Sequence, residues 1–219
     1  MRNDKPVVLI GAGGGSRDLL DVLLACGREV AGFVVDPQYA APGSIVNGHP
    51  VLGGFDWLSR HVNTVEVICG VGASEQRFRL IQRAVALGAV FCSAAHPSVI
   101  FTSKMEIGEG SCIAAGCILT SNVRIGNHVQ INVGCTLSHD TILHDFVTLS
   151  PGVHVAGNVT LLTGCFVGIG ANIIEKKTIG AWSIVGAGST ITKDVPPNTT
   201  VVGVPGRVIK TRPEGWHLS

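Results

Sequence analysis

The segment from Ile107 to Ile191 decides the fold; in groups of six it reads IGEGSC IAAGCI LTSNVR IGNHVQ INVGCT LSHDTI LHDFVT LSPGVH VAGNVT LLTGCF VGIGAN IIEKKT IGAWSI VGAGST I. A branched aliphatic residue opens every group, fifteen times in succession and without an insertion. These positions are Ile107, Ile113, Leu119, Ile125, Ile131, Leu137, Leu143, Leu149, Val155, Leu161, Val167, Ile173, Ile179, Val185 and Ile191. A fixed period of six residues is typical of a parallel β-helix, in which each hexad forms one short strand and one corner. Three hexads make one triangular coil of 18 residues, so we expect about five stacked coils with these side chains pointing inward.

The first hundred residues follow a different pattern, in which short apolar runs alternate with helical segments. Alternation of this kind indicates a small parallel α/β sheet of the Rossmann type. The expected elements are strands over 7–10, 30–36 and 65–72, helices over 17–27 and 74–88, and a closing run over 90–95. The first helix is expected to bury one face, formed by Leu19, Leu20, Leu23 and Leu24.

The two patterns divide the chain into a Rossmann-like front domain over 1–97 and a β-helix domain over 98–195. The remaining residues, 196–219, begin with Pro196 and Pro197. Because proline cannot donate a hydrogen bond to the ladder, we expect this last segment to leave the β-helix and cap its open end.

Composition narrows the classes of function. The chain has 219 residues, a formal net charge of +1 and only 14% charged residues, which does not match the basic footprint of a nucleic-acid or membrane-surface protein. Its apolar residues are interrupted throughout, so none of its runs reaches the roughly 18 residues of a membrane span. The seven Cys form no CxxC pair and the chain starts without a signal-peptide pattern. We therefore expect a cytoplasmic protein with no membrane insertion and no nucleic-acid partner.

The loop GAGGGS over 11–16 stands between an expected strand and an expected helix. Bare backbone amides at a helix N-terminus suit phosphate binding, and Asp36 ends the next strand, where an acid commonly holds a ribose. An NAD-dependent enzyme is one alternative for this region, and a purely structural strand-to-helix turn is another.

A resemblance to a known family enters at the end of the repeats. The hexads followed by KDVPPNTTVVGVPGRVI (193–209) resemble the hexapeptide-repeat acyltransferases. Together with the front domain and CTLSHDTILHDFVTLSPGVHVAGNV (135–159), nearly the whole chain resembles the bacterial nucleotide-sugar and sialic-acid acetyltransferases, which acetylate UDP- or GDP-linked amino sugars or sialic-acid hydroxyls. The resemblance implies a left-handed β-helix, acetyl-CoA as co-substrate, no metal, and a homotrimer with active sites at the subunit interfaces.

Acyl transfer from a thioester needs a base beside the attacking group. Four of the eight His residues lie in the coils: His128, His139, His144 and His154. The 18-residue coil places Gly157 directly above His139, which leaves room for a ligand beside the imidazole, and Asp140 follows at once and can orient the ring. The resemblance implies that His139 is the general base and that Asp140 supports it. The alternative is that His139 is a solvated corner residue.

The same resemblance implies the remaining site residues. Acetyl-CoA is expected in a groove between neighbouring β-helices, contacted by Thr148, Ile169 and Ala187. The nucleotide of the sugar substrate is expected to be held by Gly13, Gly14, Gly15, Asp36 and Gly72.

The expected function is transfer of an acetyl group from acetyl-CoA to the amine of a nucleotide-linked amino sugar, by direct attack. No covalent acyl-enzyme is expected, because Cys117 and Cys135 are 18 residues apart and should stack in the core. The alternatives are an O-acetyltransferase acting on sialic acid or a related sugar hydroxyl, and a non-catalytic nucleotide-binding scaffold. A carbonic-anhydrase-like β-helix is a third, although its metal would need a spacing that His139, His144 and His154 do not have.

Overall fold

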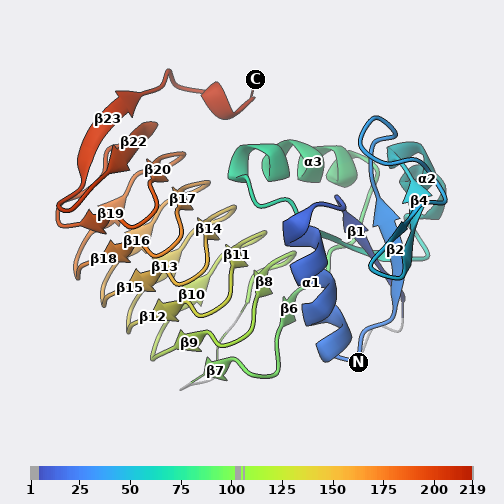
Figure 1. Cartoon of the computed structure of the whole chain (residues 1–219), viewed down its shortest axis with the longest axis horizontal. Helices are drawn as coiled ribbons and strands as arrows, with labels where there is room; N and C mark the ends of the chain where they lie inside the picture. Colours follow the sequence, from blue (N-terminus) through green and yellow to red (C-terminus); the bar gives the residue numbers. More distant parts are fainter. Residues whose placement is uncertain (1–4, 102–104, 106, 219) are drawn as a thin grey trace.

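The computed structural model describes residues 5–101, 105 and 107–218. An α/β front domain stands beside a triangular prism of stacked coils, and the C-terminal tail returns from the far end of the prism toward the front domain (Figure 1). The expected combination of a Rossmann-like sheet and a left-handed parallel β-helix is confirmed.

The front sheet has the strand order β3-β4-β2-β1-β5. β1, β2, β4 and β5 are parallel, and β3 runs antiparallel to β4. The strands are β1 Val7–Ile10, β2 Val30–Val34, β3 Ile45–Val46, β4 His49–Gly53 and β5 Glu66–Cys69. The three predicted strands are thus β1, β2 and β5, two of them shorter than expected, whereas β3 and β4 come from a stretch to which the sequence analysis assigned no element.

Helices cover both faces of this sheet. They are α1 Gly14–Ala25, α2 Phe55–His61 and α3 Ser74–Ala86. Side chains of β1 alternate between the two layers: Val7 and Leu9 join the core that contains α1, while Val8 and Ile10 join the core that contains α2 and α3. Such burial on both faces explains why the parallel strands read as continuous apolar runs.

The predicted buried face of α1 was wrong at one position. Leu24 is 47% exposed, and Val22 is buried in its place. The reason is that α1 lies between the sheet and the first coils, where its core also includes Cys112 and Ala114. The helix therefore buries a second stripe, on the side of Val22.

The run over 90–95 does not close the front sheet as a strand. Phe91 makes only an isolated bridge to Val67, and Ala94–Ala95 form β6, which pairs with β8 of the β-helix. The chain thus passes directly from the front sheet into the first coil.

Over the described residues, the prism has three sheets, one on each side. Partners are 18 residues apart, as in Thr136↔His154 and Leu137↔Val155, which confirms the predicted coil. The eight-stranded sheet comprises β6 Ala94–Ala95, β8 Cys112–Ile113, β11 Gln130–Ile131, β14 Thr148–Leu149, β17 Phe166–Val167, β20 Ile184–Val185, β22 Thr199–Val202 and β23 Arg207–Thr211. The six-stranded sheet comprises β7 Ile100–Phe101, β9 Ile118–Leu119, β12 Thr136–Leu137, β15 His154–Val155, β18 Asn172–Ile173 and β21 Thr190–Ile191. The four-stranded sheet comprises β10 Arg124–Ile125, β13 Ile142–Leu143, β16 Thr160–Leu161 and β19 Thr178–Ile179.

The core of the prism is a column of the hexad aliphatics. All of them from Ile113 to Ile191 are buried, and Ile107 packs against them at the open end. Cys117 and Cys135 are fully buried among them, and their thiols donate to the carbonyls of Asn132 and Ser150. Both cysteines therefore belong to the core, as predicted.

Residues with a positive φ recur at the corners of the prism, one above another in successive coils. At the corner after the six-stranded sheet, Asn122, Asp140 and Asn158 have φ of 60°, 58° and 59°. Asn and Asp are the non-glycine residues that tolerate this left-handed conformation best. The sequence therefore builds a column of short polar side chains along one edge of the prism.

The corner after the four-stranded sheet carries aromatic residues instead. Phe146 and Trp182 have φ of 61° and 55°, which is strained for bulky side chains. Phe78 of α3 packs edge-on against both rings, at centroid separations of 5.1 and 5.6 Å. Aromatic packing between the two domains offsets the backbone strain at this corner.

The segment 196–219 leaves the β-helix only in part. β22 adds one more parallel strand beside β20, and β23 then folds back antiparallel to β22. The prolines fall outside these strands, so the ladder can continue through Thr199–Val202. The tail ends in the short 3-10 helix η1, Trp216–Leu218, where the His217 ring stacks on Trp182 at 3.8 Å and η1 contacts α3.

One buried arginine ties the two domains together. Arg77 of α3 is 1% exposed, and burial lowers its pKa to about 10, so it remains charged at neutral pH. Its guanidinium donates within 3.3 Å to the carbonyls of Val71, Gly72, His128, Phe146 and Val147 and to Oγ1 of Thr148. Four of these acceptors lie on the coils, so Arg77 fixes where the helix sits on the prism.

None of the helices in the described part of the chain is long and apolar enough to cross a membrane.

Candidate active site

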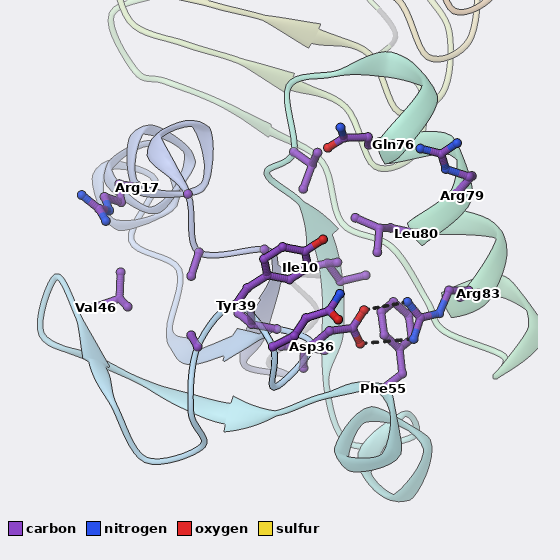
Figure 2. A pocket seen from close by; sticks show the side chains of 18 residues that line it. Ile10, Arg17, Asp36, Tyr39, Val46, Phe55, Gln76, Arg79, Leu80 and Arg83 are labelled. Atoms are coloured by element: carbon purple, nitrogen blue, oxygen red, sulfur yellow. Dashed lines mark hydrogen bonds and ion pairs between the residues drawn. The ribbon is translucent and has the colours of Figure 1, made fainter. Parts of the chain in front are cut away.

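The front domain contains a cavity of about 760 Å³ at the carboxyl ends of β1 and β2 (Figure 2). One wall is the loop after β1, and the opposite wall is α3. The chain runs from β1 to β2 on one side and later returns to β5 on the other side of β1. Crevices at such a reversal of strand order are where open α/β sheets bind ligands.

The three glycines of the predicted loop contribute to this pocket in different ways. Gly13 lines the cavity and caps α1, while Gly14 opens the helix, and a Cβ at either position would meet no atom within 4 Å. A bare helix N-terminus of this kind suits a phosphate group. Gly15 also has a packing role, because a Cβ there would lie 2.7 Å from the carbonyl oxygen of Gly70.

Asp36 lies in the pocket wall and is held in place. Its carboxylate accepts two hydrogen bonds from Arg83 of α3, at 2.9 and 3.2 Å, drawn as dashed lines in Figure 2. The Arg83 guanidinium lies 3.8 Å from the centre of the Phe55 ring. The forked ion pair and the stacking fix the guanidinium plane, so the pocket has a preformed polar end.

Further pocket residues escaped the sequence analysis. Gln76, Arg79, Leu80 and Arg83 all project from one face of α3, and Tyr39 comes from the loop after β2. The spacing 76, 79, 80 and 83 is the helical i, i+3, i+4, i+7 pattern, so their common face could have been read from the sequence. That this face borders a pocket depends on how α3 lies against the sheet, which the spacing does not reveal.

Two predicted site residues meet at the domain junction instead of in the pocket. The carbonyl of Gly72 accepts hydrogen bonds from Arg77 and from Oγ1 of Thr148, and Thr148 is 1% exposed. Its hydroxyl also contacts Ser74 Oγ at 3.1 Å. Thr148 is one of the residues predicted to contact acetyl-CoA, and a contact through its side chain would require this junction to open.

His139 and Asp140 form a pair at the corner between β12 and β13. Nδ1 of His139 lies 2.8 Å from Oδ2 of Asp140, and the two side chains are 59% and 46% exposed. This hydrogen bond, and a second one from Asn122, lower the pKa of Asp140 below its usual range, so the carboxylate stays charged. A charged acceptor at Nδ1 favours the tautomer that has the proton there, which makes Nε2 the basic nitrogen.

The predicted stacking of Gly157 on His139 is present. A Cβ built on Gly157 would lie 2.6 Å from both Nε2 and Cε1 of the imidazole. The absence of a Cβ at Gly157 therefore leaves room for the imidazole ring itself, which lies directly against this glycine.

Ile169 and Ala187 come together on a third edge of the prism. They are stacked one coil apart, with a 2.8 Å hydrogen bond from the Gly188 amide to the Ile169 carbonyl, and both are exposed. Thr148 is not part of this column. The structure therefore brings together two of the three residues predicted to contact the cofactor.

Other coil histidines have different surroundings. His128 is buried between Phe91 and Phe146, and burial lowers its pKa. His144 and His154 are exposed, and Nδ1 of His154 lies 2.8 Å from Oγ1 of Thr136. Among the described residues, no three His, Cys, Asp or Glu side chains gather as they would around a metal ion.

The pocket and the His139 corner lie on opposite sides of the molecule. In Figure 1 the pocket elements β1, β2 and α3 lie to the right, whereas the turn from β12 to β13 lies at the left edge of the prism. One chain therefore does not join the two regions into a single site.

Comparison with known proteins connects these observations. A family model described as the PglD N-terminal domain matches residues 6–84. Perosamine N-acetyltransferase from Caulobacter crescentus, solved with CoA and GDP-perosamine, is 32% identical over 94% of this chain and 97% of its own, with a TM-score of 0.87. The chain belongs to the nucleotide-sugar acetyltransferase family of the hexapeptide-repeat acyltransferases.

Further members of the family and superfamily agree with this assignment. The acetyltransferase domain of PglB from Neisseria gonorrhoeae, solved with acetyl coenzyme A, is 29% identical over 94% of this chain and 99% of its own, with a TM-score of 0.85. Curated sequences match only a short segment. The bifunctional protein GlmU of Rubrobacter xylanophilus is 48% identical over 50 residues, and galactoside O-acetyltransferase of Escherichia coli is 50% identical over 46 residues. These segments span 11% and 23% of the two curated proteins.

Within this acetyltransferase framework, Gly157→Ala tests the position of the His139 imidazole, which packs on Gly157. The backbone of Gly157 is not in the left-handed range, so alanine fits the main chain, but its methyl group must push the imidazole aside. We expect kcat/KM to fall about 100-fold, as for a displacement of about 1 Å at a reacting group, with an unchanged circular dichroism spectrum. Ser121→Ala, one coil below in the same column, is the matched control and should remain active. Full activity in Gly157→Ala would contradict the assigned position of the reacting group.

Proposed function

We propose that this protein transfers the acetyl group of acetyl-CoA to the amine of a nucleotide-linked amino sugar, with His139 as the general base. The observation that carries the proposal is the His139 imidazole, which is 59% exposed and is held at Nδ1 by Asp140, so that Nε2 can accept a proton. The whole-length likeness to perosamine N-acetyltransferase supports the substrate class, and the acetyl-CoA and CoA complexes of the relatives support the co-substrate.

The front pocket is assigned to the nucleotide. Its glycine loop and the N-terminus of α1 suit the phosphates, and Arg17 lies beside this loop in the lining. The opposite end, with Asp36, Tyr39 and the stacked Arg83, offers hydrogen bonds and an aromatic surface to the nucleoside. Gly14 and Gly15, in the first turn of α1, assist through their backbone amides. Gly72 accepts hydrogen bonds at the domain junction, and its contact with the nucleotide stays a prediction.

The chemistry is a single transfer. The sugar amine attacks the thioester carbonyl while Nε2 of His139 accepts the proton of the amine. The carbon–sulfur bond then breaks, the amide is left on the sugar, and the CoA thiolate recovers a proton from the imidazolium. Asp140 stabilises the charged ring during this sequence without taking the proton itself.

The site requires more than one chain. Because the pocket and His139 lie on opposite sides of one molecule, we assign the active site to the boundary between copies in a homotrimer, with CoA along the exposed column of Ile169 and Ala187.

Gly13→Trp should fill the nucleotide pocket, since a Cβ at Gly13 meets open space. Gly13→Trp and His139→Ala should each be inactive, but co-expressed chains should recover activity. An absence of recovery in verified mixed trimers would count against a shared site.

The activity itself is tested by the release of CoA thiol from acetyl-CoA in the presence of UDP- and GDP-linked 4-amino sugars. We expect release with at least one amine-bearing substrate and none with its N-acetylated form. Release with sialic acid or another sugar hydroxyl would favour O-acetylation. If calorimetry detects nucleotide-sugar binding but none of these compounds yields CoA, the protein is a binding scaffold and the proposal is wrong.

A further inference from the structure

Asn122 lies one coil below Asp140 in the column of left-handed corner residues. Its side-chain amide Nδ2 donates to Oδ1 of Asp140 at 3.0 Å, while the other carboxylate oxygen, Oδ2, faces Nδ1 of His139 at 2.8 Å. The backbone beneath is fixed by the coil register, since the Asp140 amide donates to the Ser121 carbonyl at 3.0 Å. Both oxygens of Asp140 are thus engaged, one by the imidazole and one by Asn122.

We propose that Asn122 is a positioning residue for acetyl transfer, which orients the Asp140 carboxylate and through it the His139 imidazole. This inference rests on the proposed role of His139 as the base. The side-chain amide of Asn122 donates to Asp140 and not to the imidazole, so Asn122 acts through the pair and not on the substrate.

The physical need for such a residue follows from the exposure of the pair. The Asp140 side chain is 46% exposed, so packing does not hold its torsion angles. A carboxylate that turns about its own axis presents either oxygen to the ring, and the imidazole then loses its fixed plane. An amide donor on the far oxygen removes that freedom, which is how outer partners hold ligating and catalytic histidines elsewhere.

Asparagine meets two demands at this position. Its backbone has φ of 60°, which asparagine tolerates better than most residues, and its short side chain ends in a hydrogen-bond donor. An aspartate would meet the first demand and fail the second. The same donor also lowers the pKa of Asp140, next in size to the effect of His139.

The test compares three variants. Asn122→Gly keeps the left-handed backbone without strain and removes the donor. Asn122→Asp keeps the shape and places a second carboxylate against Asp140. Asn158→Gly is the matched control, because Asn158 has the same conformation (φ 59°) one coil above Asp140 and is exposed.

In Asn122→Gly we expect kcat to fall about 10-fold, the lower end of the loss that follows removal of an orienting partner. The KM for the nucleotide sugar should not change, because the pocket lies in the front domain. Carboxyl-carbon NMR should show the pKa of Asp140 rising toward its usual range, and ring-nitrogen NMR should show a mixture of His139 tautomers. Asn122→Asp should raise the pKa of Asp140 further through like-charge repulsion and lose more activity. Asn158→Gly should match the wild type in every measurement.

The outcomes separate this inference from the proposed function. If His139→Ala is inactive but Asn122→Gly retains wild-type kcat and NMR signals, Asn122 does not position the pair and this inference is overturned. If His139→Ala is active, the proposed base is wrong, and with it the role of Asn122 in the transfer. The NMR measurements, which need no substrate, would then still report whether Asn122 orders the pair.

Discussion

His139→Ala should lower kcat about 10²- to 10⁴-fold, the usual contribution of a positioned acid–base group. Binding of acetyl-CoA and of the nucleotide sugar should persist, because neither the front pocket nor the Ile169–Ala187 column includes the imidazole. The side chain is exposed at a corner, so its removal should not affect folding. Single-turnover kinetics with pre-bound acetyl-CoA would measure the chemical step separately from binding.

His144→Ala is the control for this experiment. His144 is an exposed histidine five residues further along the same coil, directly after β13. It should retain nearly full activity. Equal losses of kcat in both variants would mean that removal of any exposed histidine from this part of the prism lowers activity, so His139 would have no special role. An active His139→Ala would exclude His139 as the base.

Arg77→Met should give the largest loss of stability, about 4 kcal/mol of unfolding free energy. Gly72 O keeps a donor in Thr148 Oγ1, Val147 O keeps the Gln130 amide, and Thr148 Oγ1 keeps the hydroxyl of Ser74. The carbonyls of Val71, His128 and Phe146 lose their donor. A buried acceptor that loses its donor costs roughly 1 to 3 kcal/mol, so three such losses account for the expected value.

Urea unfolding at one fixed protein concentration would measure this loss, since the stability of an oligomer depends on concentration. Arg77→Lys should fall between Arg77→Met and wild type, because an ammonium keeps the charge but has only three donors. Arg60→Met, at an exposed position of α2, should stay within about 0.5 kcal/mol of wild type. An Arg77→Met protein as stable as Arg60→Met would show that the domain junction does not depend on this guanidinium.

The parts of the fold that depend on short sequence periods could be predicted. The coil register follows from the hexads alone, and the contact of Gly157 with His139 follows from adding 18 to a residue number. The same arithmetic places Asn122 under Asp140, so this residue could have been found by applying the coil period to Asp140 as well as to His139. The order of the central strands β2, β1 and β5 is likewise consistent with the alternating pattern of the front domain.

The parts that depend on how distant segments meet could not be predicted. The exposure of Leu24 follows from the place of α1 against the first coils, which the helical pattern does not encode. Thr148 reads as an ordinary strand residue, and only the docking of α3 encloses its hydroxyl. The nucleotide pocket likewise needs the loop after β2 and one face of α3 at the same edge of the sheet, and no local pattern relates those two segments.

The return of the tail to the front domain sets the height of the prism. A duplication of 18 residues beyond Gly157 would preserve every corner column, and a β-helix taken alone would accept it. It would, however, raise β22 and β23 by one strand spacing, about 4.8 Å, while α3 stays fixed on the lower coils through Arg77. His217 could then no longer stack on Trp182 and also reach Phe78. The contacts of the C-terminal residues with both Trp182 and Phe78 therefore restrict the number of coils that fits this front domain. A duplication that adds a coil would keep these contacts only if the tail became longer as well.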